Sequence, residues 1–152
     1  MSDNTLQRCE RLRSLKAIRR LFADGRGGFV YPFRYMFFVE KAGAASSVEG
    51  MAASNDENVA LISDPTADVM NGGIEVMFSV PKKFHKRANK RNVLKRRTRE
   101  AYRLNCEQLR IKVSDSGKML DLALVYSTKE ILSYKTIEHA VQRILGQVCE
   151  RM

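Results

Sequence analysis

Hydrophobic residues recur at helical spacing in three parts of the chain. Residues 6–23 form the first predicted helix, with Asn4 or Thr5 as the expected N-cap. The last predicted helix follows Ser133, a favourable N-cap residue, and carries a regular apolar stripe. Between them, residues 87–110 contain neither Pro nor Gly and are rich in good helix formers, which predicts a long central helix.

Four segments have the character of β-strands. The first two, 28–31 and 34–40, are separated by Pro32, which cannot donate a hydrogen bond inside a sheet. Residues 74–80 alternate between apolar and polar side chains. Residues 120–127 form an apolar run that is typical of a strand buried on both faces.

The predicted order of elements is α-β-β-β-α-β-α. This order indicates an α+β fold, a single-domain α/β sandwich that spans residues 1–152. Residues 41–73 break the pattern, because they contain five acidic residues, one lysine and no aromatic residue. A stretch of this length without a packing pattern is expected to be a flexible insertion between two strands.

The excess positive charge of the chain is concentrated in one segment. Residues 82–103 hold eleven of the 27 lysines and arginines and a single acid, Glu100, so their net charge of +10 equals that of the whole chain. A surface selected only for solubility mixes its signs, so this block indicates a polyanionic partner. Nucleic acid is the commonest such partner, because contacts with phosphates release counterions.

On a helix, the basic residues of this segment gather on one side. An arc of roughly 140° contains six basic or amide side chains: Arg91, Asn92, Lys95, Arg96, Arg99 and Arg103. An ordinary solvated helix face is the alternative interpretation. Such faces normally interleave glutamate with lysine, whereas Glu100 stands alone here. The arc is therefore predicted to contact phosphates.

The spacing of these residues follows a specific pattern. Arg91-Asn92 is followed after two residues by Lys95-Arg96, and after two more by Arg99-Glu100. Ala88 precedes the first pair by three residues, and Lys82-Lys83 closes the preceding strand. In type and spacing this pattern resembles the signature helix of the protein subunit of bacterial ribonuclease P. The chain departs from that family in the loop before Ala88, which is one residue longer.

The resemblance implies a fold and an activity. The signature helix is expected to join two strands by a left-handed β-α-β crossover, whereas the general rule favours a right-handed one. The chain is expected to be the accessory subunit of an endoribonuclease that matures the 5′ ends of tRNA. Its implied partners are the ribonuclease P RNA and precursor tRNA. The RNA subunit is expected to perform the hydrolysis with magnesium ions that it mainly binds itself.

The resemblance and the charge pattern together give a predicted RNA-contact site. Its residues are the basic and amide side chains of the helix arc and of the loop before it: Lys82, Lys83, Lys86, Lys90, Arg91, Asn92, Lys95, Arg96, Arg99 and Arg103.

A second predicted site is a cleft for the single-stranded 5′ leader of precursor tRNA, between the first helix and the sheet. Phe22, Tyr35 and Phe37 are its candidate residues, because aromatic rings beside basic side chains hold single-stranded nucleic acid. Tyr35 and Phe37 face one side of their strand, and Met36 and Phe38 face the other. Both faces are largely apolar, so core packing alone is the alternative for these rings.

No protein active site is predicted. The sequence has no catalytic Ser/His/Asp or Cys/His arrangement, no glycine-rich phosphate loop and no metal-binding spacing of cysteine and histidine. We therefore nominate no catalytic and no metal-binding residue. Three cysteines without close pairing, a polar N-terminus and the lack of a long apolar run lead us to expect a cytoplasmic protein with no membrane contact.

Two other functional classes are considered. A ribosomal or DNA-binding protein would also use a basic recognition helix, although a zipper-type protein needs heptads after Arg103, which the sequence does not continue. A nuclease that acts without an RNA subunit would need a carboxylate cluster for magnesium. The most isolated acids lie in the 41–73 insertion, which disfavours such a cluster.

Overall fold

A four-stranded sheet forms the centre of the computed structural model, which describes residues 6–41 and 73–152. The strand order is β1-β2-β4-β3, in which β2 is antiparallel to both β1 and β4 whereas β3 is parallel to β4. The strands are β1 (Arg26–Val30), β2 (Phe33–Lys41), β3 (Gly73–Ser79) and β4 (Lys118–Tyr126).

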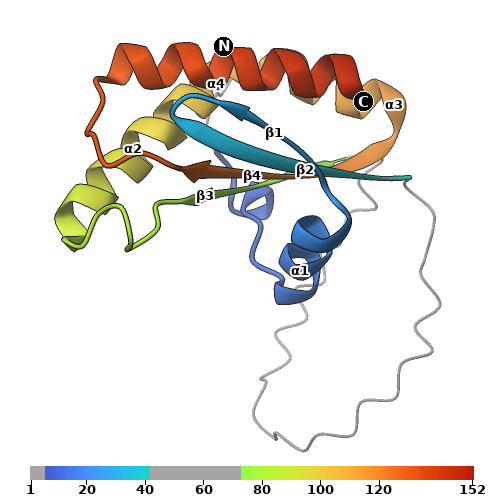
Figure 1. Cartoon of the computed structure of the whole chain (residues 1–152). Coiled ribbons are helices and arrows are strands. Elements are labelled where there is room, and N and C mark those ends of the chain that lie inside the picture. The colour runs from blue at the N-terminus through green and yellow to red at the C-terminus, as the bar shows by residue number, and fades with distance from the viewer. Residues whose placement is uncertain (1–5, 42–72) are drawn as a thin grey trace, which may run out of the picture.

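Helices lie on both faces of this sheet. Figure 1 shows α1 below the sheet and α4 above it. Buried residues of α2 and α3 share one core with those of α4. The helical elements are the short 3-10 turn η1 (Arg8–Glu10), α1 (Leu15–Asp24), α2 (Ala88–Asn105), α3 (Glu107–Ser116) and α4 (Tyr134–Arg151). The α+β class and the predicted order of elements are confirmed. The parallel pair β3 and β4 is joined through α2 and α3, and the left-handed sense of this crossover stays a prediction.

The central helical segment is divided in two at Cys106. This residue has φ −84° and ψ −4° and separates α2 from α3. Leu109 and Val113 of α3 are buried in the main core. The absence of Pro and Gly therefore predicted helical structure correctly, but it did not reveal that the chain changes direction between α2 and α3. This change of direction lets α3 contact β3, β4 and α4.

The first helix is shorter than the 6–23 range predicted from its apolar spacing. α1 begins at Leu15, and the Ser14 hydroxyl accepts a hydrogen bond of 3.4 Å from the amide of Ala17. The expected caps, Asn4 and Thr5, lie outside the described residues. The segment before α1 instead runs beside the edge strand β3, where the amide of Leu12 donates to the carbonyl oxygen of Val76 at 3.0 Å.

Two hydrophobic cores occupy the two faces of the sheet. The larger lies between the sheet and α2, α3 and α4, and contains the buried stripe of α4 that the sequence predicts. The smaller lies under α1, where Leu12, Leu21 and Ala123 are buried against partly buried Ile18, Met36, Phe38 and Met77. One face of the sheet is therefore largely covered, and the other is covered only where α1 and the segment before it cross it.

The predicted insertion connects strands that are not neighbours. Residues 42–72 lie outside the described part of the chain, so the prediction of flexibility is not examined by the structure. Its two ends are defined, because Lys41 pairs with Lys118 and Gly73 pairs with Met119 on opposite sides of β4. The two ends of the predicted insertion therefore lie on either side of the first residues of β4.

Candidate nucleic-acid interface

The rotation of α2 is fixed by a row of buried side chains. Leu94, Thr98, Ala101 and Tyr102 are buried, and the Tyr102 ring packs edge-on against Phe78 of β3 with centroids 5.6 Å apart. The Thr98 hydroxyl donates to the carbonyl oxygen of Leu94 at 2.8 Å, so its polar atom is satisfied inside the helix. The opposite side of α2 is thereby held towards solvent.

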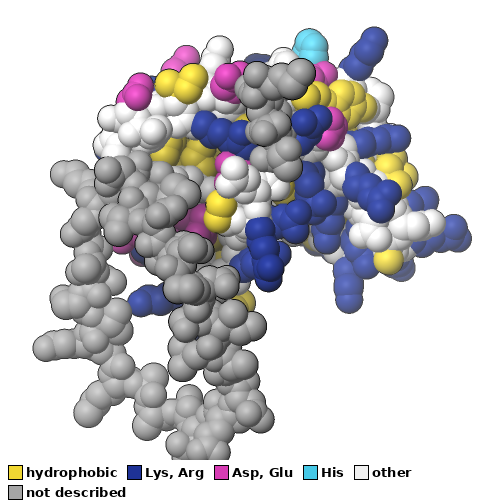
Figure 2. Space-filling model, turned by 180° about the vertical axis from the view of Figure 1, so that it is seen from behind, with side chains coloured by type: hydrophobic (Ala, Val, Ile, Leu, Met, Phe, Trp, Pro, Cys, Tyr) yellow, Lys and Arg dark blue, Asp and Glu magenta, His cyan; other side chains and the backbone are white. Residues whose placement is uncertain are grey.

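The predicted basic arc occupies that outer side. Asn92, Arg96 and Arg99 are exposed, and Lys95 is half-buried. Within residues 6–41 and 73–152, Lys95, Arg96 and Arg99 have no hydrogen-bond or ion-pair partner. Figure 2 shows Lys and Arg side chains gathered over the end of the molecule where α2 lies. The structure thus brings most of the predicted arc together as one solvent-facing cationic surface.

Arg91 belongs to the predicted arc but also has an internal role. Its Nη1 donates to the carbonyl oxygens of His85, at 2.9 Å, and Lys86, at 2.7 Å. Its side chain is half-buried at the margin of the arc. Arg91 therefore fixes the loop before α2, whatever else it contacts.

The loop before α2 is also held by His85, which is 4% exposed. His85 Nε2 lies 2.9 Å from the carbonyl oxygen of Thr128, and its ring lies 5.7 Å from that of Tyr126. These contacts attach the loop to the end of β4. The longer loop noted in the sequence thus contributes a buried side chain.

The remaining charged residues of α2 divide between internal contacts and one local ion pair. Arg97, which was not predicted as a contact residue, donates from Nη1 to the carbonyl oxygen of Leu132 at 2.7 Å. Arg103 pairs with Glu100, with Nε and Oε2 2.9 Å apart. The hydrogen bond from Arg103 lowers the pKa of the Glu100 carboxyl. The single acid of the segment is thus neutralised within the helix.

The lysines of the loop before α2 extend the cationic surface beyond the helix. Lys82, Lys83 and Lys86 of this loop are exposed, and so is Lys90 in the first turn of α2. Lys83 Nζ lies 4.9 Å from the centroid of the Phe84 ring, which places this lysine next to an aromatic side chain. The predicted supporting charge therefore lies at the start of α2, beside the less covered face of the sheet.

The predicted leader cleft is wrong for two of its three residues. Tyr35 and Phe37 are each 1% exposed and belong to the main core, on the face that α4 covers. The Tyr35 hydroxyl donates to Gln147 Oε1 at 2.6 Å. Phe22 lies on α1, on the other face, and is 46% exposed. The alternation along β2 was predicted correctly, but the face that the helices cover was not.

The face below the sheet offers other residues for such a site. Phe29 of β1 is 62% exposed and pairs across the strands with exposed Arg34. Two shallow grooves adjoin Phe29 and Arg34, one reaching Met36 and the other reaching Lys83 and Phe84. Sequence reasoning missed Phe29, although its pairing with Arg34 follows once the 28–31 and 34–40 strands form a hairpin.

Acidic side chains lie under α1, away from the basic surface. Arg20 Nη2 lies 3.0 Å from Asp121 Oδ2, and Arg20 Nη1 lies 2.8 Å from Glu40 Oε2. Burial raises the pKa of Asp121, and the hydrogen bond and charge of Arg20 oppose this rise. Burial also raises the pKa of Glu75, and the charge of its neighbour Asp121 raises it further. These contacts attach α1 to the sheet.

The described residues show no metal-binding group of three or more His, Cys, Asp or Glu side chains. In the same part of the chain, no helix is both long enough and apolar enough to cross a bilayer. The features that do stand out are a mixed sheet, a cationic helix held by a packed core, and a partly open sheet face. They define a single-domain α+β protein with an arginine-rich helical surface.

Comparison with known proteins identifies the family. The model of the Ribonuclease P family matches residues 6–148, so this chain belongs to that family. It is 29% identical over 143 residues to a protein named ribonuclease P protein component from Porphyromonas gingivalis, covering 94% of this chain and 85% of that protein. A second strain of that organism has a protein of the same name that is 29% identical over 145 residues, with the same coverage.

A solved structure shows the same fold. The ribonuclease P protein of Staphylococcus aureus superposes with a TM-score of 0.58 at 14% sequence identity, covering 91% of this chain and 94% of that one. The fold implied by the sequence resemblance is thereby confirmed at the level of architecture.

Proposed function

We propose that this chain is the protein subunit of a ribonuclease P ribonucleoprotein. In this role it binds the RNA subunit and the 5′ leader of precursor tRNA, and it assists maturation of the tRNA 5′ end. The observation that carries the proposal is the solvent-facing cationic arc of α2, whose Lys95, Arg96 and Arg99 have no partner among the described residues, in a chain of this family.

The arc and the loop before it supply the contact with the RNA subunit. Each phosphate neutralised by a lysine or arginine releases counterions, so affinity falls steeply with salt. Guanidinium groups also bind phosphate through two parallel hydrogen bonds, which favours arginine on such a surface. The contact residues are the ten that the sequence predicts, with Arg91 holding the loop as well as contributing charge.

The leader lies on the sheet face below, beside α1. Phe22 and Phe29 present exposed rings there, and exposed Arg34 and Lys83 lie beside Phe29. Stacking on aromatic rings combined with nearby cations suits a single strand. Because mature tRNA lacks the leader, contacts with the leader favour precursor over product, and the protein acts by differential binding.

Bond cleavage is assigned to the RNA subunit. Magnesium ions are expected to be held mainly by the RNA, and no catalytic residue is assigned to this chain. The protein is expected to work in the cytoplasm without membrane contact.

The proposed RNA contact is tested by the salt dependence of binding. The triple variant Lys95→Gln, Arg96→Gln, Arg99→Gln removes three unpartnered cations. The matched control, Lys129→Gln, Lys135→Gln, Arg143→Gln, removes three exposed cations outside α2. Each phosphate that is no longer neutralised should reduce the log–log slope by about 0.7–0.9 relative to wild type. Equal slopes in all three proteins would show that this arc does not face RNA.

A further inference from the structure

A cationic pocket lies at the end of the sheet where β1 begins. Arg26, the first residue of β1, pairs with Phe37, while β2 continues to Lys41 without a described partner on that edge. This difference in strand length leaves a pocket at the edge of the sheet. Its lining includes Phe37, Val39, Lys118, the last residue of α4, Arg151, and the residue after it, Met152. We call this the step pocket.

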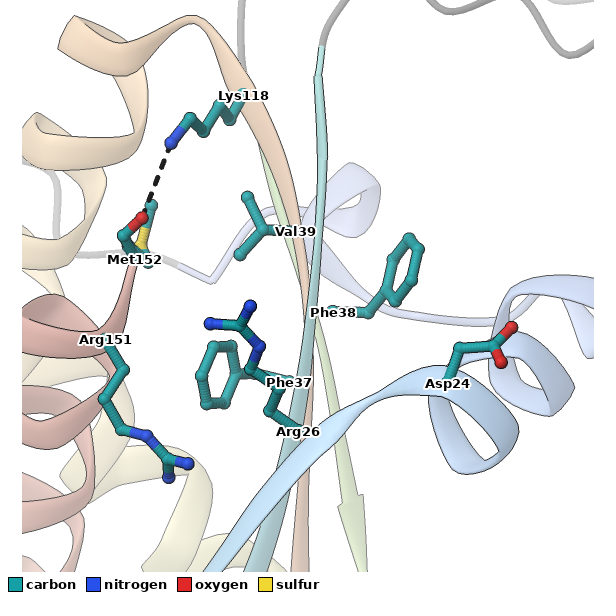
Figure 3. Close-up of a pocket in the computed structure, with 8 residues that line it drawn as sticks. All are labelled: Asp24, Arg26, Phe37, Phe38, Val39, Lys118, Arg151 and Met152. Carbon is teal, nitrogen blue, oxygen red and sulfur yellow. Dashed lines mark hydrogen bonds between the residues drawn. The ribbon is translucent and has the colours of Figure 1, made fainter.

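Three cations from three different elements line the step pocket. Arg26 comes from β1, Lys118 from β4 and Arg151 from α4. Figure 3 shows these side chains on one side of β2, whereas Asp24, the lining carboxylate, lies on the other. Like charges repel when they are brought together, so such a grouping calls for a compensating anion.

The partners of these cations are neutral side chains or main-chain oxygens. Arg151 Nη1 lies 3.3 Å from both the carbonyl oxygen of Gly27 and the hydroxyl of Tyr35. Lys118 Nζ lies 3.5 Å from the main-chain oxygen of Met152. Arg26 is exposed, and among residues 6–41 and 73–152 it has no hydrogen bond or ion pair. No Asp or Glu side chain of the described chain forms a salt bridge with any of the three.

The wall of the pocket favours an anion held by guanidinium groups. The Arg151 guanidinium carbon lies 5.5 Å from the centroid of the Phe37 ring, which is itself 1% exposed. A low-dielectric wall strengthens the field of neighbouring charges. The lining holds two guanidinium groups and one ammonium, which are the side-chain groups that bind the oxygens of a tetrahedral anion.

We propose that the step pocket binds a phosphate group. The phosphate belongs either to an RNA backbone or to a free phosphate-bearing molecule. The pocket is formed by other elements than α2, so this site goes beyond the RNA contact and leader face proposed above. The structural alternative is that Arg151 and Lys118 only stabilise the C-terminal end of α4, where cations are favoured in any helix.

The first test is a nuclear magnetic resonance titration of the full chain with inorganic phosphate, using chloride at equal ionic strength as reference. Wild type should show saturable shifts at the Arg151 Nε–H group and at the amides of residues 26, 39 and 118. The variant Arg26→Gln, Lys118→Gln keeps the stacked Arg151 and should weaken phosphate binding at least tenfold. The control Lys129→Gln, Lys135→Gln has the same charge change and should respond as wild type does.

The second test distinguishes the two sources of phosphate. If RNA supplies it, the same double variant should reduce the log–log salt slope by about 0.7–0.9 for each phosphate that is no longer neutralised, while the control keeps the wild-type slope. Measuring the slope with the RNA subunit, and then with precursor tRNA on the assembled holoenzyme, identifies the RNA. A saturable phosphate response with unchanged slopes would retain the site and assign it to a free phosphate-bearing molecule.

The proposal is overturned if wild type shows no saturable phosphate shift at these groups, or if the double variant and wild type respond alike. A lowered melting temperature of the double variant without any phosphate response in wild type would establish the structural alternative instead. Should the double variant fail to fold, the single variant Arg26→Gln gives the same test, because Arg26 has no partner in the described residues. The titration does not depend on the ribonuclease P assignment, so the two can fail independently.

Discussion

The Nη1 of Arg91 donates a hydrogen bond of 2.9 Å to the carbonyl oxygen of His85. The same nitrogen reaches the next carbonyl, that of Lys86, at 2.7 Å. His85 is in turn buried and its ring bonds to the carbonyl oxygen of Thr128. An arginine from the predicted arc therefore holds the loop that carries the neighbouring lysines, so this one residue contributes both to the cationic surface and to the loop geometry.

This coupling predicts that Arg91 and Arg99 respond differently to the same substitution. Arg91→Gln should lower the free energy of unfolding by about 1–2 kcal/mol, because two carbonyl groups lose a charged donor. Arg99→Gln should leave it within about 0.5 kcal/mol, because an exposed side chain without a partner is removed. Urea unfolding of both variants measures the difference. Equal stabilities would show that the Arg91 contacts do not hold the loop.

The proposed position of the leader predicts that exposed and buried aromatic residues respond differently to substitution. Phe29→Leu should lower the ratio of holoenzyme affinities for precursor over mature tRNA, since a stacked base is worth roughly 1–3 kcal/mol. Phe33→Leu is the matched control, because Phe33 is buried on the opposite face and does not line the step pocket. It should lower stability and leave the ratio unchanged. If Phe33→Leu lowers the ratio and Phe29→Leu does not, the leader does not bind to the face beside α1.

Glu75 predicts a pH dependence of stability. Its folded-state pKa is raised by burial and by the charge of Asp121, so the folded state holds this proton more tightly than the unfolded state does. The stabilisation is present below the unfolded pKa and is lost as the pH rises through the folded one. Glu75→Gln should therefore raise the melting temperature at pH 7.5 relative to wild type.

The control for this prediction is the same comparison at low pH. Near pH 4, where Glu75 is largely protonated, the difference between Glu75→Gln and wild type should shrink towards zero. Two results would contradict a raised folded-state pKa of Glu75. One is a variant that is less stable than wild type at pH 7.5, and the other is a difference in melting temperature that does not change with pH.

The strand order predicts how residues 42–72 can be removed. Lys41 and Gly73 flank β4, so a replacement linker must span two strand spacings, about 10 Å. A two-residue turn should therefore destabilise the protein. A linker of about five Gly and Ser residues should leave it folded and able to bind RNA, because surface insertions have a low entropic cost. Loss of the fold with the longer linker would show that residues 42–72 are needed for stability.

The elements that the sequence predicted best are those with strong periodicity. The apolar stripe of α4 and its Ser133 cap appear as predicted, with Ser133 Oγ accepting from the amide of Thr136 at 3.5 Å. The alternation along β2 is also correct. It could not show which face is covered, because both faces carry apolar side chains and only the placement of α1 and α4 decides between them.

Other features depended on contacts distant in sequence. The division at Cys106 reflects packing of α3 against β3 and α4, which local propensity does not encode. The role of Arg91 reflects the path of the preceding loop around buried His85. For the exposure of the basic arc, charge and helical spacing were sufficient, since a dense cation block with a single acid cannot be buried and must face solvent or a polyanion.

The central claim is that this chain promotes cleavage by an RNA enzyme without cleaving RNA itself. It is tested by reconstitution at low magnesium from three components: the purified protein, a bacterial ribonuclease P RNA and a precursor tRNA, each omitted in turn. The account predicts that the protein alone produces no cleavage, that the RNA alone cleaves slowly, and that adding the protein increases cleavage at the mature 5′ end. Cleavage by the protein without the RNA subunit, or no effect of the protein on RNA-dependent cleavage, would contradict it.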